Sequence, residues 1–177
     1  SLKEHSPESW WRMGDDDDAG GTTIRDLGVV STTELVSNGE FAANITGWTD
    51  ESTGTGSIAW NAAGYMELIG IGLSHRGRAS AGFSTIVGGA YTLTVTIANL
   101  ANGGTYLGNT AGGTTITNNA TSGNGTHSYS FVALATTTYV TFVEAGTGTA
   151  QIDNVSVKQD NLVLNGGFDS DTIWTKG

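Results

Sequence analysis

Apolar and polar residues alternate without a break from residue 91 to residue 97, which predicts a half-buried strand. The odd-numbered positions are Tyr, Leu, Val and Ile, and the even-numbered positions are all threonine. Strict alternation of this kind is typical of an antiparallel strand that packs one face on a core. We expect the threonines to form a ladder that faces water. Gly88 and Gly89 directly precede the strand and predict a turn.

Shorter apolar or alternating runs, bounded by glycine or asparagine, follow one another along most of the chain. They predict strands at residues 57–60, 65–71, 79–86, 105–107, 114–117, 127–131, 138–143 and 150–157. No stretch carries a convincing helical stripe of apolar residues. Regular short strands separated by turns predict an all-β protein with an antiparallel β-sandwich, or jelly-roll, fold. In this interpretation the many glycines mark the turns.

The chain divides into three parts. Residues 1–33 form an extended lead-in, residues 34–158 form one β-sandwich module, and residues 159–177 restart the pattern of that module. The sequence Leu-Val-Ser-Asn-Gly-Glu-Phe at residues 35–41 returns as Leu-Val-Leu-Asn-Gly-Gly-Phe at residues 162–168, and a tryptophan follows each copy. This repeat indicates either the first strand of a second module or an extra strand exchanged with a neighbour.

Composition and charge exclude several classes of protein. The 177 residues include 27 glycines and no cysteine, which leaves no disulfide and no thiolate metal site. A net charge of −10 argues against a nucleic-acid partner, because phosphate contacts need clustered Lys and Arg. No apolar run is long enough to span a membrane. Between Glu67 and Glu144 the chain has no acidic residue, and such a surface of neutral hydroxyls and amides favours an extracellular or virion location.

Four motifs follow one another in a specific order. They are NGEF at residues 38–41, GW at residues 47–48, GAYTLTV at residues 89–95 and IDNVSV at residues 152–157. In this order and spacing, residues 34–158 resemble the carbohydrate-binding-module families 4 and 9 and their relatives. The resemblance implies a β-sandwich jelly roll without catalytic activity. Similar modules occur, often in tandem, in fibres and other appendages of bacterial viruses.

The lead-in carries a second resemblance. Residues 6–15, with the sequence SPESWWRMGD, look like the opening of a laminin-G or lectin-like domain found in phage proteins. Since the rest of such a domain is absent, this resemblance implies only a docking strand. Because the first residue is not Met, we expect the chain to be a processed or excised piece of a longer protein.

Aromatic side chains are the first candidates for a glycan site, because a flat ring buries the apolar C–H face of a sugar at a low entropic cost. Our stacking candidates are Trp60 and Tyr106, of which Tyr106 lies in a Gly- and Asn-rich stretch where a binding loop is expected. Arg76, in a basic cluster, is the candidate for holding an acidic sugar or a partner's carboxylate. A solvated loop is the alternative for this cluster. The resemblance implies that Trp48 packs in or near the core.

The resemblance also implies a structural metal ion. Acids in the opening and closing motifs, here Glu40 and Asp153, often hold calcium between the first and last strands of such modules. Oxygen ligands of this kind suit Ca²⁺, and no other cofactor is required. The three histidines occur in unrelated contexts, and neither a nucleophile elbow nor a phosphate loop is present. We therefore do not expect an enzyme.

Three functions remain open. The leading hypothesis is a non-enzymatic structural or adhesive module of a bacteriophage virion (a fibre, an appendage or a capsid decoration), with a cell-surface glycan as a candidate ligand. Its partners are expected to be other virion subunits in a homo-oligomer, as the resemblance implies. The first alternative is a carbohydrate-binding module of a secreted bacterial enzyme or adhesin. The second is an extracellular filament subunit that assembles by exchange of residues 159–177.

Overall fold

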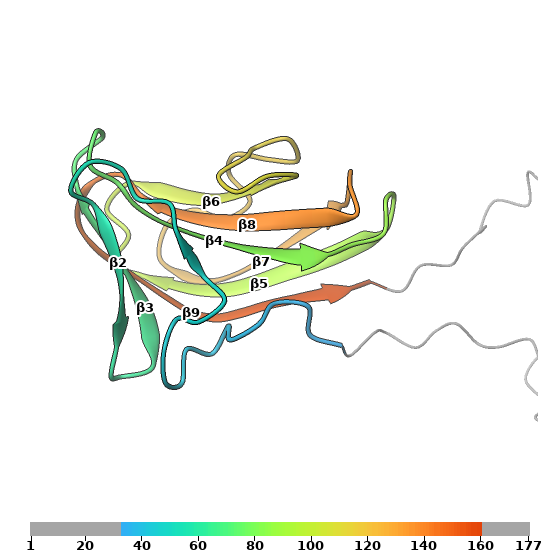
Figure 1. Cartoon of the computed structure of the whole chain (residues 1–177), viewed down its shortest axis with the longest axis horizontal. Coiled ribbons are helices and arrows are strands. Elements are labelled where there is room, and N and C mark those ends of the chain that lie inside the picture. The colour runs from blue at the N-terminus through green and yellow to red at the C-terminus, as the bar shows by residue number, and fades with distance from the viewer. Residues whose placement is uncertain (1–32, 161–177) are drawn as a thin grey trace, which may run out of the picture.

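The computed structural model describes residues 33–160, which form nine strands and no helix (Figure 1). The strands are β1 (Thr49–Asp50), β2 (Ser57–Asn61), β3 (Tyr65–Ile71), β4 (Gly77–Ser84), β5 (Ala90–Ala98), β6 (Gly103–Gly108), β7 (Gly125–Val132), β8 (Thr137–Glu144) and β9 (Thr147–Gln159). The predicted all-β class is confirmed. The lead-in of residues 1–33 and the extra strand of residues 159–177 lie almost entirely outside the described residues.

Two antiparallel sheets face each other and enclose the core. One sheet has the strand order β1-β4-β8-β6 and the other has the order β2-β3-β9-β5-β7, and Figure 1 shows them as two layers. The chain crosses repeatedly between the layers, as expected for a jelly roll. Figure 1 also shows that the two ends of the described chain lie at the same end of the sandwich. Within residues 33–160 nothing forms a helix suited to crossing a membrane.

The alternating pattern of β5 has the predicted outcome. Its apolar positions, Tyr91 among them, are buried between the sheets. The threonine face is half-buried rather than fully open to water, because β5 lies between β9 and β7. The hydroxyls of Thr92 and Ser130 lie 3.1 Å apart, and those of Thr96 and Thr126 also lie 3.1 Å apart. The ladder therefore binds the two strands to each other on the outer side of the sheet.

The opening motif differs from the sequence-based prediction, because residues 35–41 form turns and no strand. Asn38 and Phe41 have positive φ angles of 54° and 45°, which a regular strand does not allow. The segment nevertheless runs along β9, where the Leu35 N–H donates to the Val157 carbonyl at 3.0 Å. The turns aim the Phe41 side chain inward, so that it is fully buried.

Two further strand predictions need correction. Residues 114–117 form no strand, although Leu107 makes one isolated bridge to Thr117. The strand predicted at residues 79–86 is β4, which begins at Gly77 and ends at Ser84. Beyond its end, the Thr85 N–H donates to the Thr136 carbonyl at 2.9 Å and the Thr85 hydroxyl donates to the Ala135 carbonyl at 2.8 Å, in the connection before β8.

Trp48 packs in the core, as the resemblance implies. Only 8% of its surface is exposed. Its ring lies 5.5 Å from that of Phe41 and 5.6 Å from that of Phe142, measured between centroids. Since Phe142 belongs to β8 and Phe41 to the opening motif, Trp48 connects the four-stranded sheet to the first residues of the module.

A buried carboxylate holds one end of the sandwich together. Glu144, the last residue of β8, is fully buried. Its Oε2 accepts a hydrogen bond from the Ala101 N–H at 2.8 Å, and its Oε1 accepts from the Asn102 N–H at 3.2 Å and the Gly146 N–H at 2.5 Å. These donors belong to the β5–β6 and β8–β9 connections, which both cross between the two sheets. One side chain thus fixes two crossings.

Replacement of Glu144 by alanine is expected to lower the free energy of unfolding by about 3 kcal/mol, because three backbone N–H groups lose their acceptor. Glu144→Gln should also destabilise, since one of its two polar atoms is a donor. Glu67 is the matched control, because its carboxylate accepts a side-chain hydrogen bond from Asn61 at a half-buried position. Denaturant unfolding of the three variants measures the difference. Equal stability of Glu144→Ala and Glu67→Gln would show that the three hydrogen bonds to the Glu144 carboxylate are unimportant for the fold.

Candidate functional site

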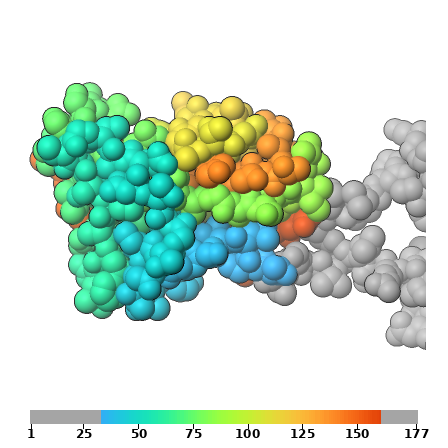
Figure 2. All heavy atoms as spheres, in the orientation of Figure 1, coloured from blue at the N-terminus to red at the C-terminus, as the bar shows by residue number. Residues whose placement is uncertain are grey.

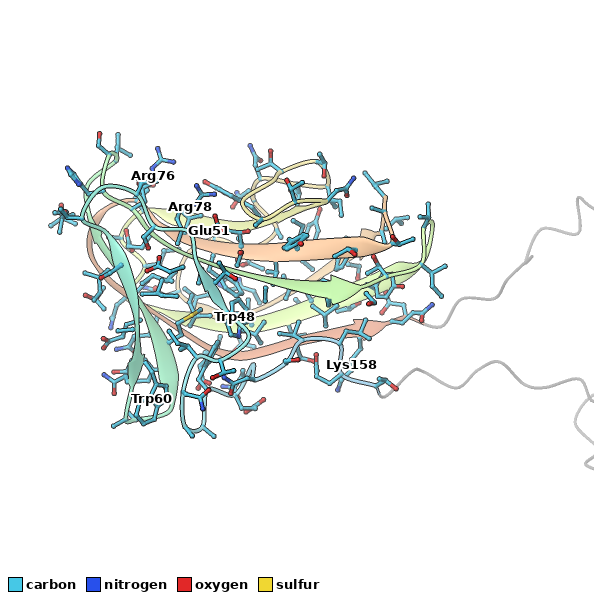
Figure 3. The ribbon with its side chains drawn as sticks, in the orientation of Figure 1. Trp48, Glu51, Trp60, Arg76, Arg78 and Lys158 are labelled. Atoms are coloured by element: carbon cyan, nitrogen blue, oxygen red, sulfur yellow. The ribbon has the colours of Figure 1, made fainter. Side chains whose placement is uncertain are left out.

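The three side chains predicted to bind a glycan lie in different parts of the fold. Trp60 is on β2 at the edge of the five-stranded sheet, Arg76 is in the loop between β3 and β4, and Tyr106 is on β6 of the four-stranded sheet. Figure 3 shows Trp60 and Arg76 at opposite ends of the β2–β3 hairpin. The structure does not bring the three together.

Neighbouring backbone holds two of these side chains in place. Trp60 is 38% exposed, and its indole N–H donates to the Phe41 carbonyl at 2.7 Å. The Arg76 Nε donates to the Leu73 carbonyl, also at 2.7 Å. Both hydrogen bonds orient the side chain against its own surroundings. The fold places no other predicted glycan-binding residue next to Trp60 or Arg76.

Tyr106 belongs to a polar and aromatic surface on the outside of the four-stranded sheet. Its neighbour Leu107 is buried in the core, so Tyr106 points to the opposite side. The strand register places Tyr106 beside Thr141 on β8, and Thr141 beside Ser80 on β4. We name this set the outer-face cluster, and its members are Glu51, Arg78, Ser80, Tyr106, Tyr139 and Thr141. Ser80 and Thr141 are buried, and the other members are half-buried.

Two tyrosine rings from adjacent strands lie in the outer-face cluster. Tyr139 stands two residues before Thr141 on β8 and therefore shares its side of the sheet. A Cβ atom on Gly82 would lie 2.8 Å from the Tyr139 ring, which shows that this ring rests on the glycine. Tyr106 and Tyr139 are both half-buried. Diagonal neighbours of this kind are close enough for both rings to contact one ligand.

Arg78 lies in the same cluster, under the loop of residues 109–115. Its Nη2 donates to the Gly112 carbonyl at 3.5 Å, and the Gly112 N–H donates to the Thr141 hydroxyl at 3.0 Å. Figure 2 shows this loop, in yellow, packed against the orange atoms of β8. The Arg78 Nε and the Asn109 Oδ1 are buried and have no hydrogen-bond partner. Such orphaned groups are uncommon in native proteins and call for an explanation.

Glu51 places a carboxylate next to this arginine. Its backbone N–H donates to the Arg78 carbonyl at 2.9 Å, which extends the pairing of β1 with β4. Its Oε1 accepts a long hydrogen bond of 3.5 Å from the Ser80 hydroxyl. Figure 3 shows Glu51 and Arg78 side by side. The cluster therefore contains a strong acceptor and a strong donor on the same side of the sheet as the two aromatic rings.

This arrangement suits a ligand with an apolar face and many hydroxyl groups. A tyrosine ring can bury the apolar face, while a guanidinium donates to hydroxyl oxygens and a carboxylate accepts from hydroxyl protons. Charged groups strengthen such hydrogen bonds. The outer-face cluster thus supplies the three types of contact that a sugar ring needs.

Sequence reasoning selected Tyr106. It considered Tyr139 only as one of several aromatic residues on which a sugar could stack, and Arg78 only as part of the basic cluster of Arg76. Arg78 directly precedes the strand predicted at residues 79–86. This position was the signal that its side chain could point outward from the sheet. Tyr139 also stands within a predicted strand, on the side opposite Val140. Glu51 has no comparable local signal, because only the pairing of β1 with β4 brings it to this surface.

The structure places the predicted calcium ligands on neighbouring segments. The Val155 N–H donates to the Gly39 carbonyl at 3.0 Å, so the stretches that contain Asp153 and Glu40 run side by side. Glu40 is exposed and Asp153 is half-buried. Between residues 33 and 160, no group of three or more His, Cys, Asp or Glu side chains is gathered for a metal ion. Calcium would need backbone carbonyls and water to complete its usual coordination.

Comparison with known proteins adds a likeness in fold. No family model and no curated protein sequence matches this chain. Among solved structures, BiXyn10A CBM1 in its apo form matches with a TM-score of 0.52 and 16% identity, over 73% of this chain and 98% of that chain. The enzymatically active domain of tailspike protein 4 from bacteriophage CBA120 matches with a TM-score of 0.50 and 19% identity, over 71% of this chain and 21% of that chain. The carbohydrate-binding module TmCBM27 has a TM-score of 0.47 and 16% identity, over 73% of this chain and 97% of that chain.

At such low identity the likeness concerns the fold alone. It covers nearly the whole of BiXyn10A CBM1, and the two antiparallel sheets described above account for it. The described part of this chain is therefore a β-sandwich of the jelly-roll type, with the fold of a carbohydrate-binding module.

Proposed function

We propose that this protein is a non-enzymatic module that binds a neutral glycan on the outer face of its four-stranded sheet. The observation that carries the proposal is the outer-face cluster, in which the half-buried Tyr106 and Tyr139 share one side of the four-stranded sheet with Arg78, whose Nε is buried and unpartnered. The fold shared with BiXyn10A CBM1 supports the same class of function. A neutral ligand is favoured because the chain has a net charge of −10 and Glu51 lies in the cluster.

We propose that this module is part of a virion. The location would be extracellular both for a virion and for a secreted bacterial protein. Support comes from the likeness in fold to a phage tailspike domain and from the long stretch without acidic residues. Neighbouring genes for capsid or tail proteins would favour this setting, in which other virion subunits are the partners. A glycosidase domain in the same gene would favour a carbohydrate-binding module of a secreted bacterial enzyme instead.

Replacement of either tyrosine of the cluster by alanine is expected to weaken glycan binding about tenfold, because the apolar face of the sugar loses its platform. A glycan array identifies a ligand for the unmodified chain, and calorimetry then compares Tyr106→Ala and Tyr139→Ala with it. Tyr65→Ala is the matched control, since Tyr65 is a half-buried tyrosine on the other sheet. Binding to no glycan, or equal losses in all three variants, would refute the proposed site.

The two arginines separate the outer-face cluster from the site that the sequence suggests. Arg78→Gln should lower the affinity about tenfold, because a charged donor to the sugar hydroxyls is lost. Arg76→Gln and Trp60→Ala should both bind normally, since Arg76 and Trp60 lie outside the cluster. Loss of binding in Arg76→Gln and Trp60→Ala, with Arg78→Gln unaffected, would favour the sequence-based site. Melting temperatures confirm that each variant is folded.

A structural calcium ion between the opening and closing motifs is also proposed. Glu40 and Asp153 are its candidate side-chain ligands, on segments joined by the hydrogen bond between Val155 and Gly39. Calcium chloride should raise the melting temperature of the chain, because an ion that binds only the folded state stabilises it. Magnesium and the variant Asp153→Asn serve as controls that should show no shift. An equal response of Asp153→Asn and the unmodified chain to calcium would contradict this assignment.

A further inference from the structure

The opening segment, residues 34–41, occupies a slot along β9. The Leu35 N–H donates to the Val157 carbonyl and the Val155 N–H donates to the Gly39 carbonyl, both at 3.0 Å. The Glu34 carboxylate accepts from the Val157 N–H at 2.8 Å. Because β5 pairs with this part of β9 on one side, the opening segment fills the other side. There it continues the line of β3, whose pairing ends at Ile152.

The slot imposes different demands on successive residues. Val36 and Phe41 are buried with 4% and 0% of their surface exposed. Gly39 is buried as well, and a Cβ atom there would lie 1.9 Å from the Val155 carbonyl oxygen. Ser37 and Glu40, in contrast, are exposed. Only the buried positions are therefore constrained by contact with β9 and the core.

The repeat at residues 162–168 keeps the residues of the opening segment at the positions that are buried or half-buried there. Five of its seven residues are identical to those at residues 35–41, and all five identities fall on buried or half-buried positions. The two differences stand at the exposed positions, where Leu164 replaces Ser37 and Gly167 replaces Glu40. Identity in this segment thus follows burial in the slot. We infer that residues 162–168 are a second occupant of the β9 slot in the same chain.

The chain is long enough for this exchange. If Leu162 takes the place of Leu35 beside Val157, four residues, 158–161, remain for the return. Connections of that length are common in hairpins. The return would end β9 at Val157, because Lys158 and Gln159 pair with β5, and the Asp160 N–H donates to the Ala90 carbonyl at 2.9 Å. The exchange therefore gives up these last contacts with β5.

Glu34 decides which segment normally holds the slot. Its carboxylate accepts from the N–H groups of Leu35 and Val36 at 3.0 Å and from the Ser156 hydroxyl, in addition to Val157. The corresponding residue of the repeat is Asn161, whose side chain is shorter by one methylene and carries no charge. The opening segment is therefore the resident occupant, and the repeat replaces it when the opening segment is pulled away or impaired.

A double-mutant cycle in the full chain tests this inference. Gly39→Ala places a Cβ atom against the Val155 carbonyl and expels the opening segment, and the repeat should then keep the loss of melting temperature below about 5 °C. Gly39→Ala combined with Gly166→Ala puts the same clash into both segments and should cost about 10 °C or more. Gly39→Ala combined with Gly167→Ala is the matched control. Because the counterpart of Gly167 is the exposed Glu40, this pair should melt like Gly39→Ala alone.

Hydrogen exchange provides a second measurement, since the Val157 amide should stay protected in Gly39→Ala and lose protection when Gly166→Ala is added. Three results would overturn the inference. They are equal melting temperatures of the two double variants, unfolding of Gly39→Ala alone, and a dimer of Gly39→Ala in size-exclusion chromatography, which would place the repeat in the slot of another copy.

Discussion

The Glu144 carboxylate is the constraint on which the arrangement of the two sheets depends. A buried charge is costly unless its hydrogen-bonding capacity is used, and here three backbone N–H groups use it. Those groups belong to two connections that cross between the sheets, so the same contact fixes where β6 begins and where β9 begins. Because Tyr139 and Thr141 stand on the strand that Glu144 ends, the position of the outer-face cluster follows from this contact as well.

At the other end of β9, a segment that is no strand takes the place of one. Two residues with positive φ, Asn38 and Phe41, prevent a regular ladder. The two backbone hydrogen bonds to Val155 and Val157 nevertheless satisfy the side of β9 that β3 leaves open. The turns that break the strand also direct Phe41 under Trp48. Loss of regular pairing is thus offset by a closed core.

Local patterns predict the strands of this protein well and its binding surface poorly. The alternation that identifies β5 is a property of seven consecutive residues, 91–97, so no knowledge of other strands is needed. The turns at Asn38 and Phe41 depend instead on contacts with β9 and Trp48, and an apolar run such as Leu-Val in residues 35–41 therefore suggests a strand wrongly. The outer-face cluster depends on the register of β4, β8 and β6. That register places Arg78 and Tyr139 on one surface, and neither residue's neighbours in sequence contain this information.

The glycines show most clearly what the fold adds to the composition. The sequence suggests that they mark turns, yet Gly82 and Gly108 stand inside strands that border the outer-face cluster. A Cβ atom on Gly82 would meet the Tyr139 ring at 2.8 Å, and one on Gly108 would meet the backbone of Gly113 at 2.6 Å. Glycine within a strand is expected where another group approaches the backbone closely. These two glycines let an aromatic ring and a loop lie flat on the sheet, so the shape of the proposed glycan surface depends on side chains that are absent as much as on those that are present.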